Sequence, residues 1–114
     1  MSEPVFVMKK NELEAGKVRK FDLCGNAIAV YNLNGTFYAT QDNCTHATAS
    51  LSEGDIVDDE CIACPVHDGT FHIPTGQPMS FPCEHAIRTY KVIDQGDAVM
   101  VDFDQEADEA ADAI

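Results

Sequence analysis

The sequence predicts an all-β protein, an antiparallel β-sandwich or open barrel with a loop-rich subdomain at one end. Three observations lead to this fold class. Short runs rich in β-branched and aromatic residues follow one another along the chain, Gly, Pro, Asn and Asp stand between them, and hardly any stretch has helical periodicity. At 114 residues, we expect one domain, residues 1–103, followed by an acidic tail, residues 104–114.

The first part of the chain is predicted to form four strands, residues 5–8, 18–23, 26–33 and 36–40. Between the first two, we expect Asn11 to cap a helical turn with Glu14 in capping-box register, and Gly16 to end it. Cys24-Gly25-Asn26 is the expected turn between the second and third strands. Asn34 and Gly35 predict a tight hairpin, because both residues tolerate positive φ.

The second part of the chain begins with residues 44–54, which lack periodicity and predict a loop. Three short strands are expected next, followed by a loop that carries Pro78 and Pro82, and then by a final hairpin around residues 94–97. The expected strands are 56–57, 61–63, 70–73, 87–93 and 98–103. The tail is rich in Ala and acidic residues and has no wide apolar face, so we expect a frayed helix or disorder there.

Charge and cysteine content limit the function classes. The net charge of −13 argues against nucleic-acid binding, keeps the protein soluble and can steer it toward a basic partner. The cysteine number, five, is odd, and no export signal precedes the first strand, so we expect reduced, metal-bound thiols in the cytoplasm. No apolar run of about 18 residues is present, which argues against a membrane span.

Two mixed Cys/His pairs form the central motif of the sequence. The first is Cys44-Thr45-His46 and the second is Cys64-Pro65-Val66-His67. A structural zinc module usually pairs Cys with Cys and His with His. Mixed pairs instead favour a two-iron cluster with two Cys on one iron and two His on the other, held between two loops.

These residues, with the flanking Asp68-Gly69-Thr70-Phe71 and Pro74-Thr75-Gly76, resemble the cluster loops of Rieske-type ferredoxins of bacterial aromatic-ring-hydroxylating dioxygenases. The resemblance extends over most of the chain, residues 4–103. It implies one 2Fe–2S cluster in a subdomain of residues 43–83, with the loop 77–83 covering a third side. The implied ligands are Cys44 and Cys64 on one iron, and His46 and His67, at the surface, on the other.

The resemblance also implies a function. The protein is expected to be a monomeric one-electron carrier, without catalysis of its own, that receives electrons from a flavin-dependent NAD(P)H reductase and passes them to a terminal Rieske oxygenase. Two alternatives stay open. One is the Rieske small subunit of another oxidoreductase, such as a nitrite reductase; the other is a colourless, redox-silent, zinc-stabilised interaction module.

The other cysteines and histidines are assigned structural roles. Cys61 and Cys64 form a C-x-x-C pair, but Cys64 already belongs to the second Cys/His pair and no βαβ pattern suggests a thioredoxin fold, so Cys61 is expected to be a half-buried strand residue. We expect Cys24 and Cys83 to be small packing residues. His72 and His85 are expected to be strand or surface histidines, and Asp68 and Glu84 to be solvated acids.

Two positions predict a low reduction potential. High-potential Rieske proteins carry Ser two residues and Tyr four residues after the second His ligand, whereas this chain has Gly69 and Phe71. Their loop-linking disulfide is also absent, because Pro65 and Ala47-Thr48-Ala49 stand where its cysteines would be. Hydroxyl donors raise the potential, so we expect a midpoint near the low end of the Rieske range of roughly −150 to +300 mV.

Overall fold

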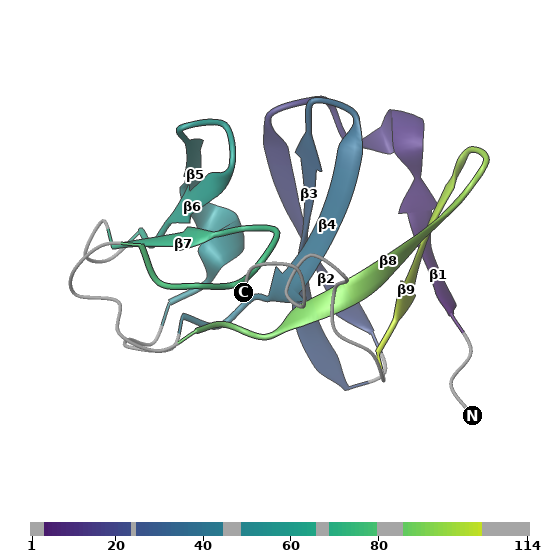
Figure 1. The fold of residues 1–114 in the computed structure, drawn as a ribbon. Helices are drawn as coiled ribbons and strands as arrows, with labels where there is room; N and C mark the ends of the chain where they lie inside the picture. The colour runs from purple at the N-terminus through teal and green to yellow at the C-terminus, as the bar shows by residue number, and fades with distance from the viewer. Residues whose placement is uncertain (1–3, 24, 45–48, 66–68, 80–85, 104–114) are drawn as a thin grey trace.

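The structure is a computed structural model, and it describes residues 4–23, 25–44, 49–65, 69–79 and 86–103. Two antiparallel sheets lie next to each other, a larger one and a smaller one (Figure 1). The predicted all-β fold is confirmed, since the only helices among the described residues are two short 3₁₀ turns, η1 and η2.

The larger sheet has six strands in the order β1-β9-β8-β4-β3-β2. Its longest ladder joins β2 to β3, from Lys17 opposite Asn32 to Leu23 opposite Asn26. Asn34, with φ of 56°, and Gly35, with φ of 96°, form the predicted hairpin between β3 and β4. The strands span β1 Val5–Lys9, β2 Lys17–Leu23, β3 Asn26–Leu33, β4 Thr36–Gln41, β8 Thr89–Gln95 and β9 Ala98–Asp102.

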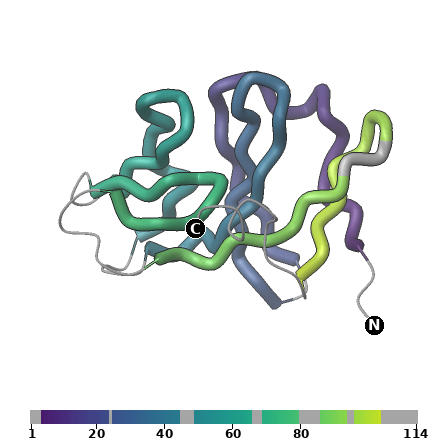
Figure 2. The backbone as a smooth tube through the Cα atoms, in the orientation of Figure 1, coloured from purple at the N-terminus to yellow at the C-terminus, as the bar shows by residue number. Residues whose placement is uncertain are grey.

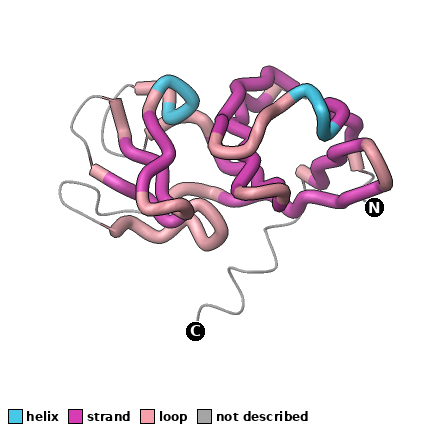
Figure 3. The backbone as a smooth tube through the Cα atoms, turned by 90° about the horizontal axis from the view of Figure 1, so that it is seen from above, coloured by secondary structure: helices cyan, strands magenta, loops and turns pink. Residues whose placement is uncertain are grey.

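The smaller sheet has three strands in the order β5-β6-β7. They are β5 Asp55–Val57, β6 Cys61–Ala63 and β7 Thr70–His72. The 3₁₀ turn η2, Leu51–Glu53, precedes them, and Figure 3 shows it on the side of the small sheet, apart from the N-terminal η1. Leu51 of η2 is completely buried and packs in the same hydrophobic cluster as Ile62 of β6.

The small sheet is an insertion between two neighbouring strands of the large sheet. The chain leaves through β4 and returns through β8, and these strands pair at Ala39 opposite Tyr90 and Thr40 opposite Thr89 (Figure 2). Just beyond the ladder, the Gln41 N–H donates to the Arg88 carbonyl at 2.8 Å, and the Arg88 N–H donates to Gln41 Oε1 at 2.7 Å. The exit and return points are therefore joined by hydrogen bonds.

The buried apolar side chains fall into two clusters. One, made by Met8, Leu13, Ile28, Val30 and their neighbours, lies within the large sheet. The other joins the two sheets, because Ala29 and Tyr31 of β3 pack in it with residues of the small sheet and its loops; its further buried members are Cys44, Leu51, Ile62, Cys64, Phe71, Ile73 and Ile87. The second cluster therefore fixes the position of the small sheet.

Two local predictions were wrong. The N-terminal helical turn is η1, Lys10–Glu12, and Glu12 rather than Glu14 accepts the capping hydrogen bond, from the Lys9 N–H at 2.9 Å. The turn follows strand β1 directly and starts earlier than expected, at Lys10, whose N–H donates to the Asp97 carbonyl.

The final hairpin also differs from its prediction. Strand β8 runs from Thr89 to Gln95, beginning and ending two residues later than expected. The turn contains only Gly96 and Asp97, because the ladder of β8 and β9 continues to Gln95 opposite Ala98 and Gly96 adopts a φ of 63°. In the part of the chain that the structure describes, no helix is long and apolar enough to cross a membrane.

Candidate metal centre

Cys44 and Cys64, the two predicted thiolate ligands, are placed in the same buried cluster. Cys44 follows β4 and Cys64 follows β6, so one comes from each side of the junction between the sheets. Their exposed fractions are 6% and 0%, and Phe71, Ile73 and Leu51 belong to the same cluster. The structure therefore brings together, in a site shielded from water, two residues that are twenty positions apart in the sequence.

Each cysteine starts a tight loop closed by its own main-chain N–H. The Cys44 N–H donates to the Ala49 carbonyl at 3.0 Å, and the Cys64 N–H donates to the Gly69 carbonyl at 2.8 Å. The two loops thus have the same closure at their base. Their tips, residues 45–48 and 66–68, lie outside the described residues, and with them the predicted ligands His46 and His67.

Asp42 closes the base of the first loop and was missed in the sequence analysis. Its carbonyl accepts the Leu51 N–H at 2.7 Å, and its Oδ1 accepts the Ser52 N–H at 2.9 Å. Asn43, which stands between Asp42 and Cys44 in the sequence, forms an isolated β-bridge with Ser50. An Asp that starts a turn is a common sequence signal, but this one bonds ten residues ahead, beyond the range of a local motif.

The second loop is supported by the chain that follows it. Phe71 of β7 is bridged to Pro78, and the Met79 N–H donates to the Thr70 carbonyl at 2.7 Å. The first part of the predicted covering loop, residues 77–79, therefore lies along β7, whereas residues 80–83 are outside the described ranges. Met79, at the end of this described stretch, is 57% exposed.

Cys61 and His72 occupy opposed positions in β6 and β7. Cys61 is buried rather than half-buried, and burial, followed by the nearby carboxylates of Asp58 and Glu60, raises the pKa of its thiol. The His72 ring bonds to Thr75 Oγ1 at 2.8 Å and to Glu60 Oε1 at 3.2 Å. Both residues have the structural surroundings expected of strand residues, and His72 has partners at both ring nitrogens.

Among the described cysteines, which are Cys44, Cys61 and Cys64, none forms a disulfide. The other residues weighed from the sequence, Cys24, Cys83, His85, Asp68 and Glu84, lie outside the described ranges.

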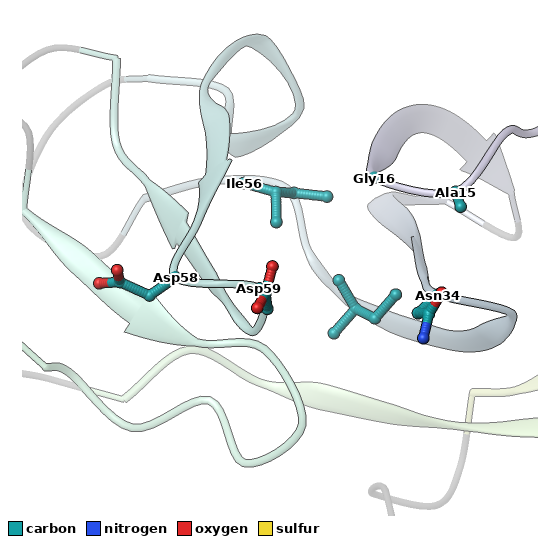
Figure 4. A pocket seen from close by; sticks show the side chains of 7 residues that line it. Ala15, Gly16, Asn34, Ile56, Asp58 and Asp59 are labelled. Atoms are coloured by element: carbon teal, nitrogen blue, oxygen red, sulfur yellow. The ribbon is translucent and has the colours of Figure 1, made fainter.

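A pocket of about 590 Å³ opens between the two sheets, and neither of the two cysteines lines it. Figure 4 shows Ile56, Asp58 and Asp59 from the β5–β6 hairpin on one side, and Asn34, Ala15 and Gly16 on the other. Asp58 and Asp59 have φ angles of 51° and 65°, in the left-handed region that Asp tolerates better than most residues. None of the residues that line this pocket is assigned to the candidate centre.

The described donors fit an iron–sulfur cluster. Two cysteines that are outside any disulfide, buried together and borne by loops of matching closure are suited to hold one iron as thiolates. The large buried apolar surround limits water at the sulfurs, one of the factors that govern reduction potential. The fold and the two cysteines suit a small iron–sulfur domain that transfers electrons.

The comparisons with known proteins agree. The model of the Rieske [2Fe-2S] domain matches residues 3–91, and the chain belongs to this family, whose ferredoxins bind one 2Fe–2S cluster. It is 41% identical over 87 residues to ferredoxin CarAc of Metapseudomonas resinovorans, covering 75% of this chain and 80% of the relative. It is 36% identical over 103 residues to the ferredoxin component of the p-cumate 2,3-dioxygenase system of Pseudomonas putida, covering 90% and 87%.

Solved structures show the same likeness. The ferredoxin of carbazole 1,9a-dioxygenase from Nocardioides aromaticivorans superposes with a TM-score of 0.83 at 33% identity, covering 86% of this chain and 95% of that one. A nitrite reductase small subunit superposes with a TM-score of 0.75 at 21% identity, covering 87% and 97%, which shows the shared fold alone. The relatives with substantial sequence identity are thus ferredoxin components of aromatic dioxygenase systems.

Proposed function

We propose that this protein is a soluble, cytoplasmic one-electron carrier of an aromatic-ring dioxygenase system. It accepts electrons from a flavin-containing NAD(P)H reductase and delivers them to a terminal Rieske oxygenase. The observation that carries the proposal is the pair of buried cysteines on matching loops, in a chain that resembles a dioxygenase ferredoxin over 90% of its length. When bound, the cluster supplies one-electron redox chemistry.

The proposed ligand set is Cys44 and Cys64 on one iron and His46 and His67 on the other. The burial of the two cysteines supports the first half of this assignment, since an iron held by both thiolates would lie on the protein side of the centre. The C-x-H and C-x-x-H spacings support the second half, because each loop that begins at a buried Cys would carry its His at the tip.

The choice of an oxygenase as electron acceptor rests on a relative. In carbazole 1,9a-dioxygenase, a complex of reduced oxygenase and oxidised ferredoxin has been solved, and its matching chain is 37% identical to this one with a TM-score of 0.82. Transient redox partners use small interfaces, which suits a monomer that meets two partners in turn. Met79, in the first part of the predicted covering loop, is exposed and offers apolar contact area to a partner.

Spectroscopy followed by reconstitution tests the function. We expect purified protein to be red-brown, and its dithionite-reduced form to give a rhombic EPR signal with low average g. Mixed with a flavin reductase, NADH and a Rieske dioxygenase, it should support substrate oxidation, and omission of this protein should stop turnover. A colourless protein with stoichiometric zinc after iron-replete anaerobic preparation would reject the electron-carrier role. A normal cluster that reduces nitrite reductase but not the oxygenase would reject the dioxygenase assignment alone.

A further inference from the structure

Asp42 is a completely buried acid, and one of its two carboxylate oxygens has no hydrogen-bond partner among the described residues. Its exposed fraction is 0%, and Oδ1 accepts the Ser52 N–H. Within the described structure, Oδ2 is a buried oxygen without a hydrogen-bond partner. Buried polar atoms without partners are rare in folded proteins and usually have a specific cause, such as a redox role.

Loop closure alone does not account for a carboxylate here. One acceptor oxygen is enough for the Ser52 N–H, and the amide oxygen of an asparagine, which has the same shape, would accept this bond without adding a charge. Burying a carboxylate without a partner for its second oxygen costs stability. The negative charge is therefore the property of Asp42 that its contacts leave unexplained.

The carboxylate lies close to the candidate centre. Asp42 is two residues from Cys44, and it bonds to Leu51, which packs in the same buried cluster as Cys44 and Cys64. Tyr31 is another member of that cluster. Burial raises the pKa of Tyr31 most, and the Asp42 carboxylate raises it further, whereas the hydrogen bond to Thr40 lowers it. The charge of Asp42 thus acts on one side chain of the cluster that holds both cysteines.

We propose that the buried carboxylate of Asp42 holds the reduction potential of the centre low. Reduction adds one negative charge, and a nearby buried negative charge opposes it with little screening by solvent or salt. This inference rests on the proposed function, because it requires the two-iron cluster. It assigns to the first loop a second source of low potential, in addition to the missing hydroxyls at Gly69, which closes the second loop, and at Phe71 in β7.

The test is a redox titration of the isolated ferredoxin, followed by its visible and circular dichroism spectra. Asp42→Asn and Asp42→Ser keep an acceptor for the Ser52 N–H and remove the charge. Both are expected to favour reduction about tenfold or more, which for one electron is a rise of about 59 mV. Asp42→Glu keeps the charge but alters the loop, and it should leave the potential near that of the natural protein.

Asp102→Asn is the matched control for a buried acid. Asp102 is 3% exposed, and its strand, β9, pairs only with β1 and β8 of the large sheet. Asp102→Asn changes the net charge by the same amount as Asp42→Asn. Because Asp102 lies in the large sheet, its variant should shift the reduction potential far less. A further criterion is salt: the shift in Asp42→Asn should persist at high ionic strength, whereas the effect of an exposed charge is screened.

Each outcome decides the matter. An unchanged potential in both neutral variants, an equal rise in Asp42→Glu, or an equal rise in Asp102→Asn overturns the proposal. Failure of both neutral variants to hold a cluster also overturns it, and makes Asp42 a residue needed for loop closure. If the natural protein itself lacks a Rieske-type spectrum, the proposed function fails; if its spectrum is normal and only the shift is missing, this inference alone fails.

Discussion

The main chain at Gly54 lies against the carbonyl of Ala63, so that a β-carbon on Gly54 would overlap the Ala63 oxygen. Asp55 and Ala63 are opposed in the ladder of β5 and β6, and Ala63 is followed directly by Cys64. Gly54 is thus needed for a close approach of two strands beneath the second cysteine, although its own φ of −88° is one that any residue can adopt.

Gly54→Ala is therefore expected to displace β6 and Cys64. Overpacking of this kind typically costs about 1–3 kcal/mol, and we expect a loss at the upper end together with reduced iron content. The measurements are thermal unfolding and iron per protein.

The control for this substitution is Gly96→Ala. Gly96 has a φ of 63° and nothing within 4 Å of an added β-carbon, so it tests backbone strain without overlap. It should cost about 1–2 kcal/mol with full iron content. Equal iron content in the two variants would contradict the proposed role of Gly54.

The ligand assignment predicts which variants lose the cluster. Cys64→Ala and His46→Ala are expected to lose the normal visible spectrum, because each removes one of four ligands. Cys61 is three residues from Cys64 but lies in strand β6, so Cys61→Ser should keep the normal iron and sulfide content with a modest loss of stability. Cys24→Ser and Cys83→Ser should give the same result. Loss of the cluster in Cys83→Ser would show that the four-ligand set is incomplete.

Part of this site could be predicted from the sequence and part could not. The four proposed ligands can be selected from the sequence because residue type and spacing are local, and the hairpin at Asn34 and Gly35 is likewise fixed by two adjacent residues. Asp42 and Gly54 were missed, since their roles depend on Ser52 and Ala63, which only the folded chain brings near. The cap at Glu12 was misassigned for a similar reason, because the Lys10 contact with Asp97 comes from the opposite end of the chain.

The potential is predicted to lie near the low end of the Rieske range, roughly −150 to +300 mV. Phe71 is completely buried in the cluster of side chains that holds Cys44 and Cys64, and its ring carries no hydroxyl that could donate to the centre. Phe71→Tyr adds one and is expected to raise the midpoint, whereas Tyr90→Phe, in the large sheet, should not change it. A clearly positive midpoint in the natural protein would contradict this prediction.

Stability is predicted to fall at alkaline pH because of Tyr31. Its hydroxyl bonds to Thr40 Oγ1 at 2.8 Å, and its pKa in the folded protein is raised well above the ordinary 10.0. The stabilisation linked to the neutral phenol is therefore complete below about pH 10 and is lost as the pH rises above that value. Tyr31→Phe should cost about 1 kcal/mol near neutrality and flatten the decline above pH 10, measured by urea unfolding. Parallel curves for the two proteins would contradict the assignment.

The hydrogen-bonded exit and return of the chain at Gln41 and Arg88 make the redox part of the molecule a replaceable module. Because the two ends of the segment meet at neighbouring strands, the strand order of the large sheet does not depend on the length of the segment, and the entropy of closing such a segment changes slowly with its length. The segment of a relative can therefore replace it, provided that apolar side chains still cover Ala29 and Tyr31 of β3. Evolution and protein engineering can therefore vary electron-transfer properties and partner contacts in this segment while the β scaffold remains the same.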